Sequence, residues 1–240
     1  MDETSHSAEL SLFLASTAHD MKNSISVLSG TLERLLDDAS PQRDAADRGP
    51  DYQQMAQMLY QTRRLNDSLM QLLALYKQVG TQHYPLDIQQ LEIGHLVEQV
   101  VGLQRVLLHS RGIALELDVD TGLIWHLDED LIIGVLAHAI NNATHYTRDK
   151  VRLAIRAVDE YLEIRVEDNG VGFPQSMLEA GAAAARGRAS GVNFLTNSAG
   201  LGLYFASEVA KMHRHRARHG ELRLENGGAY GGGCFVLRLP

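Results

Sequence analysis

Apolar residues in the first third of the chain recur at alternating spacings of three and four, the pattern of helices that pack in coiled-coil fashion. One series comprises Leu14, Ala18, Met21, Ile25, Leu28, Leu32 and Leu35, and a second comprises Met55, Met58, Thr62, Leu65, Leu69, Leu72, Tyr76 and Val79. Residues 37–51, between them, contain two prolines and no such periodicity, so we predict an antiparallel helical hairpin over residues 1–82. Both apolar stripes are wider than a two-helix seam, which predicts that two hairpins associate into a homodimeric four-helix bundle.

From residue 83 to residue 240 helical and strand patterns alternate, which indicates a second domain. The patterns predict helices over residues 88–109, 131–146 and 201–212, and strands over residues 113–119, 151–158, 161–167 and 234–239. Asp128 is the predicted N-cap of the helix over 131–146, and Trp125 begins a short strand. Segregated helices and antiparallel strands predict a two-layer α/β sandwich, so the chain belongs to the α+β class.

Two segments of this second domain lack a core pattern. Residues 174–199 scatter glycines around a run of alanines, which predicts a mobile loop or a poor helix. Residues 213–219 are rich in arginine and histidine, which predicts a solvated, basic helix end and loop. A contact with an acidic partner surface is the functional alternative for this basic segment.

Composition narrows the classes of partner. The net charge is −8, with 30 acidic against 22 basic residues, which argues against nucleic acid. The longest apolar run, residues 131–140, is too short for a membrane span, and the polar N-terminus lacks an export signal, so we expect a cytoplasmic protein. Cys234 is the only cysteine, which excludes disulfides within the chain and cysteine-based zinc sites.

A candidate nucleophile lies on the first predicted helix. His19, Asp20 and Asn23 all fall outside the apolar seam and therefore on the solvent side. A neighbouring carboxylate can orient an exposed imidazole and favour proton loss from its attacking nitrogen. The alternative for His19 is an ordinary solvated histidine.

Three further motifs lie in the second domain. Asp168 ends a predicted strand, and Gly170 and Gly172 follow it, so a carboxylate that could accept from an exocyclic amine stands beside a sharp turn. Gly200 and Gly202 open a predicted helix, whose free amide groups suit phosphate. Each of these two motifs is weak alone, since Asp-Asn-Gly is also a common turn.

The third motif is a polar cluster on the apolar helix over 131–146. Asn142 lies one turn after His138 and is followed by His145 and Tyr146. Polar groups on an apolar helix need partners, and an asparagine there could hold Mg²⁺ beside phosphate oxygens.

In this order the motifs resemble those of the sensor histidine kinases, in which a phosphoacceptor hairpin precedes a GHKL-type ATP-binding domain. The resemblance extends from about Phe13 to Pro240. Residues 19–23 resemble the phosphoacceptor box, residues 142–147 the asparagine box, and residues 168–172 and 198–203 the two glycine boxes.

The resemblance implies ATP and Mg²⁺ as cofactors and a role for each matching residue. His19 would be phosphorylated, Asp20 would be its base, and Asn23 would help when the phosphoryl group leaves. Asn142 would ligate Mg²⁺ and Asp168 would bind the adenine amine. The other residues assigned to the nucleotide site, with its lid over about 174–199, are His138, His145, Tyr146, Gly170, Gly172, Gly200 and Gly202.

The sequence departs from the family pattern at several positions. His138 stands where the family usually has asparagine and His145 where it often has lysine, so a phosphate contact is lost or weakened at neutral pH. Ser24, Ser198 and Gly233 replace a usual proline, glycine and threonine. Related ATPases such as gyrase place a water-activating glutamate at the position of His138, so we do not expect hydrolysis of ATP by water.

Three functions follow from this pattern. The first is an ATP-dependent protein histidine kinase that autophosphorylates His19 and passes the phosphoryl group to an aspartate in the receiver domain of a response regulator. The second is a histidine phosphotransfer protein of a phosphorelay with a degenerate ATP site, and the third is a dimeric, non-catalytic scaffold. Only eighteen residues precede His19, so we expect the signal to come from a separate sensor or input protein, or the chain to be part of a longer sensor.

Overall fold

The computed structural model describes residues 86–185 and 200–240 and, from the first third of the chain, residues 24, 25, 27–32, 34, 35, 54, 55, 58, 59, 61, 62 and 65. The chain divides into two compact units, Met1–Tyr84 and Pro85–Pro240. The described residues of the first unit are all helical and belong to the two segments with coiled-coil spacing. His19, Asp20 and Asn23 lie outside the described residues, and the hairpin as a whole stays a prediction.

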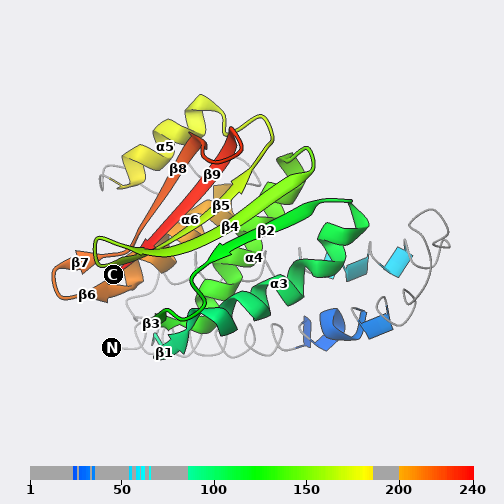
Figure 1. The fold of residues 1–240 in the computed structure, drawn as a ribbon, viewed down its shortest axis with the longest axis horizontal. Coiled ribbons are helices and arrows are strands. Elements are labelled where there is room, and N and C mark those ends of the chain that lie inside the picture. Colours follow the sequence, from blue (N-terminus) through cyan, green and yellow to red (C-terminus); the bar gives the residue numbers. More distant parts are fainter. Residues whose placement is uncertain are drawn as a thin grey trace, which may run out of the picture. The chain divides into compact units, whose positions relative to one another are not determined.

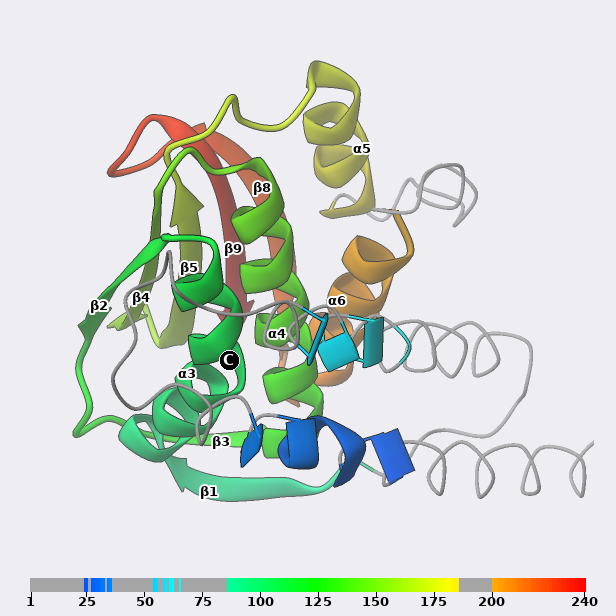
Figure 2. The ribbon, with the colours of Figure 1, turned by 90° about the vertical axis from the view of Figure 1, so that its right-hand side faces the viewer.

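The second unit is built on a five-stranded sheet. Its strands, in spatial order, are β2 (Ala114–Val119), β4 (Lys150–Val158), β5 (Tyr161–Asp168), β9 (Gly232–Leu239) and β8 (Glu221–Gly227). β2 runs parallel to β4, and the other neighbours are antiparallel. The helices α3 (Ile93–Ser110), α4 (Glu129–Tyr146), α5 (Gln175–Ala185) and α6 (Gly200–Met212) lie on one side of this sheet (Figures 1 and 2). This arrangement confirms the predicted two-layer α/β sandwich.

Local signals account for the central elements. The Asp128 carboxylate accepts a hydrogen bond from the Leu131 amide at 3.1 Å, so Asp128 caps α4 as predicted. Asp159 and Glu160 have φ values of 50° and 64°, and this pair of left-handed residues forms the tight turn that joins β4 to β5. Both elements therefore follow from residues close in sequence.

Three predictions for this unit were wrong in detail. Residues 88–92 form strand β1 (Ile88–Glu92) rather than the first turns of a helix, because they pair with β3 (Ile124–Asp128). Residues 213–219 contain the short hairpin of β6 (Arg214–His215) and β7 (Arg218–His219), and β8 was not predicted. For β1 a partner strand elsewhere in the sequence overrides the helical pattern, whereas β6 and β8 form hairpins with the strands that follow them, β7 and β9.

The predicted alternation in the strand over 113–119 holds only in part. Leu115 is half-buried, but Leu117 is 47% exposed, although the two-residue period of a strand places both on the same face. β2 is an edge strand of the sheet, where cover by the helices is incomplete.

The core lies between the helices and the inner face of the sheet. Its largest fully buried side chains are Ile93, Leu96, Leu127, Ile132, Leu136, Ile140, Leu153, Ile155, Leu162, Ile164 and Leu203. Each such side chain contributes about 1.5–3 kcal/mol to the free energy of unfolding. This burial fixes α4 against β4, β5 and α6, and α4 carries the asparagine motif.

The outer face of the sheet carries an ionic ladder across neighbouring strands. At its centre the Glu167 carboxylate accepts from Arg152 Nη1 at 2.9 Å and from Arg165 Nε at 3.1 Å. Burial alone would raise the pKa of Glu167, but hydrogen bonds and the charges of Arg165 and Arg152 outweigh it and lower that pKa. The ladder continues through Asp118 on β2 and Glu225 on β8, so it reaches both edge strands of the sheet.

Candidate functional site

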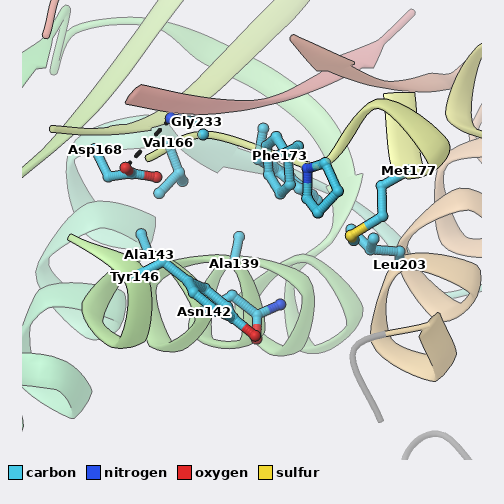
Figure 3. Close-up of a pocket in the computed structure, with 13 residues that line it drawn as sticks. Ala139, Asn142, Ala143, Tyr146, Val166, Asp168, Phe173, Met177, Leu203 and Gly233 are labelled. Carbon is cyan, nitrogen blue, oxygen red and sulfur yellow. Dashed lines mark hydrogen bonds between the residues drawn. The ribbon is translucent and has the colours of Figure 1, made fainter. Parts of the chain in front are cut away.

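A cavity of about 270 Å³ opens between α4, the C-terminal end of β5, α5, α6 and β9 (Figure 3). Its lining consists of Ala139, Asn142, Ala143, Tyr146, Val166, Asp168, Gly172, Phe173, Pro174, Met177, Leu203, Gly233 and Phe235. The walls are mostly apolar, with one carboxylate and one carboxamide among them. A cavity of this kind suits a flat ring system that a few polar groups orient.

Asp168 provides the carboxylate and is buried, with 6% of its surface exposed. Its Oδ1 accepts hydrogen bonds from the Gly170 amide at 2.7 Å and the Gly233 amide at 3.2 Å, the latter drawn in Figure 3. Both bonds engage one oxygen, so they fix the carboxylate and leave Oδ2 to accept from a ligand. Asp168 therefore lies at the cavity, and its contact with an adenine amine stays a prediction.

Gly170 and Gly172, which follow Asp168, allow the backbone to pass close to neighbouring atoms. A Cβ atom on Gly170 would lie 2.0 Å from the carbonyl oxygen of Tyr146, so only glycine can pass the end of α4 here. Gly172 has a φ of +81°, and its Cβ would lie 2.7 Å from Oδ1 of Asn226. The loop that leaves β5 can therefore follow the cavity only because these positions lack side chains.

Asn226 on β8 was missed by the sequence analysis. Its Oδ1 accepts from the Phe173 amide at 2.7 Å, and its Nδ2 donates to the Phe173 carbonyl at 2.9 Å. These two bonds hold the backbone at the position where the Phe173 ring enters the cavity wall. No local motif marks Asn226, because β8 itself was not predicted.

Asn169, which follows Asp168, has a structural role that the sequence analysis did not predict. Its Oδ1 accepts from the Thr147 hydroxyl at 2.7 Å and from the amides of residues 148, 149 and 150 at 3.1–3.2 Å. Its Nδ2 donates to Asp149 Oδ1 at 2.7 Å. Asn169 thereby joins the connection after α4 to the end of β5, and it positions the two elements that carry Asn142 and Asp168.

Asn142 lies on α4 at the edge of the cavity, and His138 lies behind it. His138 Nε2 is 2.8 Å from Asn142 Nδ2, and burial lowers the pKa of His138 to about 4, so the ring is uncharged at neutral pH. A Cβ on Gly202 would lie 1.8 Å from the same Nε2, so Gly202 leaves room for the imidazole. The structure thus places His138 between α4 and α6 instead of on the cavity wall, where a ligand-binding residue was expected.

The remaining predicted residues divide between the cavity and the surface. Tyr146 lines the cavity although its side chain is 60% exposed. His145 is exposed, and its Nδ1 lies 3.3 Å from the Asn141 carbonyl oxygen. Gly200 is the first residue of α6. The first part of the predicted flexible lid, Gln175–Ala185, forms helix α5, which packs Gly181 against Leu224 of β8.

The oxygen donors near the cavity suit a metal that arrives with its ligand. In the part of the chain that the structure describes, no three His, Cys, Asp or Glu side chains come together in a way that could hold a metal ion. Mg²⁺ commonly keeps its waters and takes one or two protein oxygens together with phosphates. The carboxamide oxygen of Asn142 is a suitable single donor for such an ion.

The chain is similar in sequence to known ATPases and histidine kinases. Residues 127–240 match the family described as histidine kinase-, DNA gyrase B-, and HSP90-like ATPase. The signal transduction histidine-protein kinase AfsQ2 of Streptomyces coelicolor is 28% identical over 95% of this chain and 41% of its own length. The sensor-like histidine kinase SenX3 of Mycolicibacterium smegmatis is 26% identical over 95% of this chain and 56% of its own length.

Solved structures show the same fold. Full-length ShkA in complex with AMPPNP has a TM-score of 0.56 at 23% identity and covers 95% of this chain and 45% of its own. The catalytic domain of the histidine kinase ThkA has a TM-score of 0.53 at 18% identity and covers 65% of this chain and 96% of its own.

The chain spans about half the length of the curated relatives it matches. Among the described residues, every helix is too short or too polar to cross a membrane. Residues 127–240 match the histidine kinase-, DNA gyrase B- and HSP90-like ATPase family, and the chain is similar to histidine kinases over almost all of its length.

Proposed function

We propose that this protein is an ATP-dependent histidine kinase that phosphorylates His19 and passes the phosphoryl group to an aspartate of a response regulator. The observation that carries the proposal is the Asp168 carboxylate, which two backbone amides hold at an apolar cavity beside Asn142. The ShkA structure, which has this fold, contains the ATP analogue AMPPNP. The relatives named as histidine kinases support the choice of reaction.

The cavity favours adenine over guanine. Val166, Leu203 and Phe235 offer apolar surface to a flat ring, and Asp168 Oδ2 can accept from the exocyclic amine of adenine. Guanine has a carbonyl oxygen at the corresponding position, and a carboxylate cannot donate to it. Placing two acceptors against each other in a buried site is unfavourable, so ATP is the expected nucleotide.

Asn142 is the proposed protein ligand of Mg²⁺. When bound, the ion would neutralise charge on the phosphates during phosphoryl transfer. Asn142 Oδ1 would hold the ion at the edge of the cavity. His145 stands where many relatives have lysine, so we expect weaker contact with the phosphates at neutral pH.

The transfer step requires residues of the first unit. A nitrogen of His19 would form a bond to the γ-phosphorus while the bond to the bridging oxygen of ADP breaks, and Asp20 would accept the imidazole proton. Asn23 would assist when the phosphoryl group leaves for the regulator. Hydrolysis by water is not expected, because the buried, uncharged His138 replaces a carboxylate base.

We further propose a homodimer formed through the first unit. Several large apolar side chains of its described residues are exposed, namely Val27, Leu28, Leu35, Met58 and Leu65. Exposed leucines at coiled-coil spacing favour association with a second helical hairpin. A cytoplasmic location and a separate input protein remain part of the same proposal.

One observation favours a second candidate, a phosphotransfer protein with a degenerate ATP site. His145 Nδ1 lies against a main-chain carbonyl of its own helix, and His138 lies behind the cavity wall. Both positions then contribute less to phosphate binding than the usual lysine and asparagine would. Such a protein would accept a phosphoryl group from a regulator rather than from ATP.

Incubation with γ-labelled ATP and Mg²⁺ separates the two candidates. We expect acid-labile, base-stable label on the wild-type protein and on the exposed control His126→Gln, and none on His19→Gln or Asn142→Ala. Failure of the folded wild type to take label, together with uptake of label from a phosphorylated receiver domain, would contradict the kinase and favour the phosphotransfer protein.

A further inference from the structure

A carboxamide that ligates a metal must face it with the correct end. The oxygen of an asparagine side chain can coordinate a cation, whereas its nitrogen carries two hydrogens and cannot. The two ends have nearly the same size, so packing alone distinguishes them poorly. A hydrogen-bond partner with a defined donor or acceptor character is therefore needed to orient Asn142.

His138 provides such a partner. Its ring is buried, with 8% of its surface exposed, and lies one helical turn before Asn142 on α4. An uncharged imidazole has one donor nitrogen and one acceptor nitrogen. Nε2 lies 2.8 Å from Asn142 Nδ2, an arrangement that matches Nε2 as the acceptor and the ring proton on Nδ1.

Gly202 keeps the imidazole in this place. A Cβ at position 202 would lie 1.8–2.4 Å from three atoms of the His138 ring, including Nε2. The close approach of α6 therefore leaves the ring little freedom to move away from Asn142. The second glycine of the Gly-x-Gly motif thus has a steric role toward α4, in addition to its place at the start of α6.

We propose that His138 is a positioning residue that orients the carboxamide of Asn142 so that Oδ1 is available to a nucleotide-bound divalent cation. With the ring proton on Nδ1, Asn142 donates through Nδ2 and directs Oδ1 away from His138. With the proton on Nε2, Asn142 would have to accept through Oδ1 and present its NH₂ group, which cannot ligate a metal. This inference rests on the proposed function, because it concerns the same nucleotide site.

The loss of such an outer partner typically weakens metal binding about 10–100-fold. We therefore expect His138→Leu, which fills a similar space without an acceptor, to weaken Mg²⁺-dependent binding of ADP by about that factor. His138→Gln restores a carbonyl acceptor and should recover most of the loss. Binding of ADP in the presence of a chelator should be the same in all three proteins, because His138 does not contact the base.

Calorimetric titration with ADP, with Mg²⁺ and with chelator, measures this pattern, and His126→Gln is the matched control on an exposed histidine. Equal Mg²⁺-dependent binding by wild type and His138→Leu would overturn the inference. Loss of binding in both conditions would also overturn it, because the role of His138 would then be packing. If the wild type binds no ADP in either condition, the proposed function fails instead.

A nuclear magnetic resonance readout tests the inference without nucleotide. In the ligand-free protein labelled with ¹⁵N at histidine, we expect the His138 signals of a neutral ring with a protonated Nδ1 and an unprotonated Nε2. His138→Leu identifies the resonance by its disappearance. A protonated Nε2 at neutral pH would contradict the orientation of Asn142 and overturn the inference even if the protein binds ATP.

Discussion

Glu167 and Asp168 are adjacent carboxylates at the end of β5, and the alternation of the strand sends them to opposite faces of the sheet. Both are buried. Two arginines neutralise Glu167 on the outer face, whereas Asp168 on the cavity face is bound by two backbone amides through one oxygen. Burial of a charge therefore identifies no function by itself. The carboxylate with an oxygen left for a ligand is the candidate binding group.

The largest expected effect concerns Asp168→Asn. The asparagine oxygen can keep the two backbone hydrogen bonds, which leaves an NH₂ group facing the cavity where the adenine amine is expected. Two donors then oppose each other, and we expect ATP binding to weaken about 100-fold or more, roughly 3 kcal/mol, while GTP binding improves relative to ATP. Calorimetry with both nucleotides measures the change, and unaltered ATP affinity would refute the role of Asp168.

Glu167→Gln should show the opposite behaviour. Removal of this charge leaves Arg152 and Arg165 without their shared partner, and we expect a loss of about 2–3 kcal/mol in the free energy of unfolding. ATP affinity of the folded protein should stay within about threefold of wild type, because Glu167 lies on the face of the sheet opposite the cavity. A threefold change is less than about 1.4 kcal/mol, which corresponds to tenfold. Urea denaturation and calorimetry measure the two quantities, with the exposed Glu98→Gln as control. A large loss of affinity without a loss of stability would reverse the comparison.

Acid provides a smaller test of the same ion pairs. The pKa of Glu167 is lower in the folded protein than in the unfolded chain, so its stabilisation is present above the unfolded pKa and is lost as pH falls through the folded pKa. We expect the stability of wild type to decrease more steeply below about pH 4.5 than that of Glu167→Gln. Urea denaturation from pH 7 to pH 3 measures both curves. Parallel curves would mean that Glu167 gains no net stabilisation from the arginines.

The elements of the second unit differ in how well the sequence predicts them. α4 and its Asp128 cap, and the hairpin of β4 and β5, were predictable because their signals lie within a few residues. β1 was not, since it exists through pairing with β3, a strand distant in sequence. β8 was missed although its partner β9 follows it directly in the chain and Leu222 and Leu224 alternate with charged residues. A distant partner therefore explains the error at β1, whereas the alternation in β8 was a local signal from which that strand could have been predicted.

Some residues of the candidate site were predictable from motifs, and others depend on contacts between distant segments. Asp168, Asn142 and Gly172 were predicted from their motifs and line the cavity. The position of His138 behind Asn142 depends on how closely α6 approaches α4, which no spacing in the sequence records. Asn226 was missed for a similar reason, because its partner, Phe173, is 53 residues away.

Asn226→Leu gives the smallest expected effect and tests whether the cavity face depends on support from β8. The leucine removes both hydrogen bonds to the Phe173 backbone, at about 1 kcal/mol of net interaction, and frees the loop that carries the Phe173 ring. We expect ATP affinity to decrease about fivefold and the free energy of unfolding to fall by about 1 kcal/mol, less than for Glu167→Gln. Asn226→Asp is the matched variant, because it keeps the acceptor for the Phe173 amide and loses only the donor. If both variants bind ATP as the wild type does, support from β8 does not contribute to nucleotide binding.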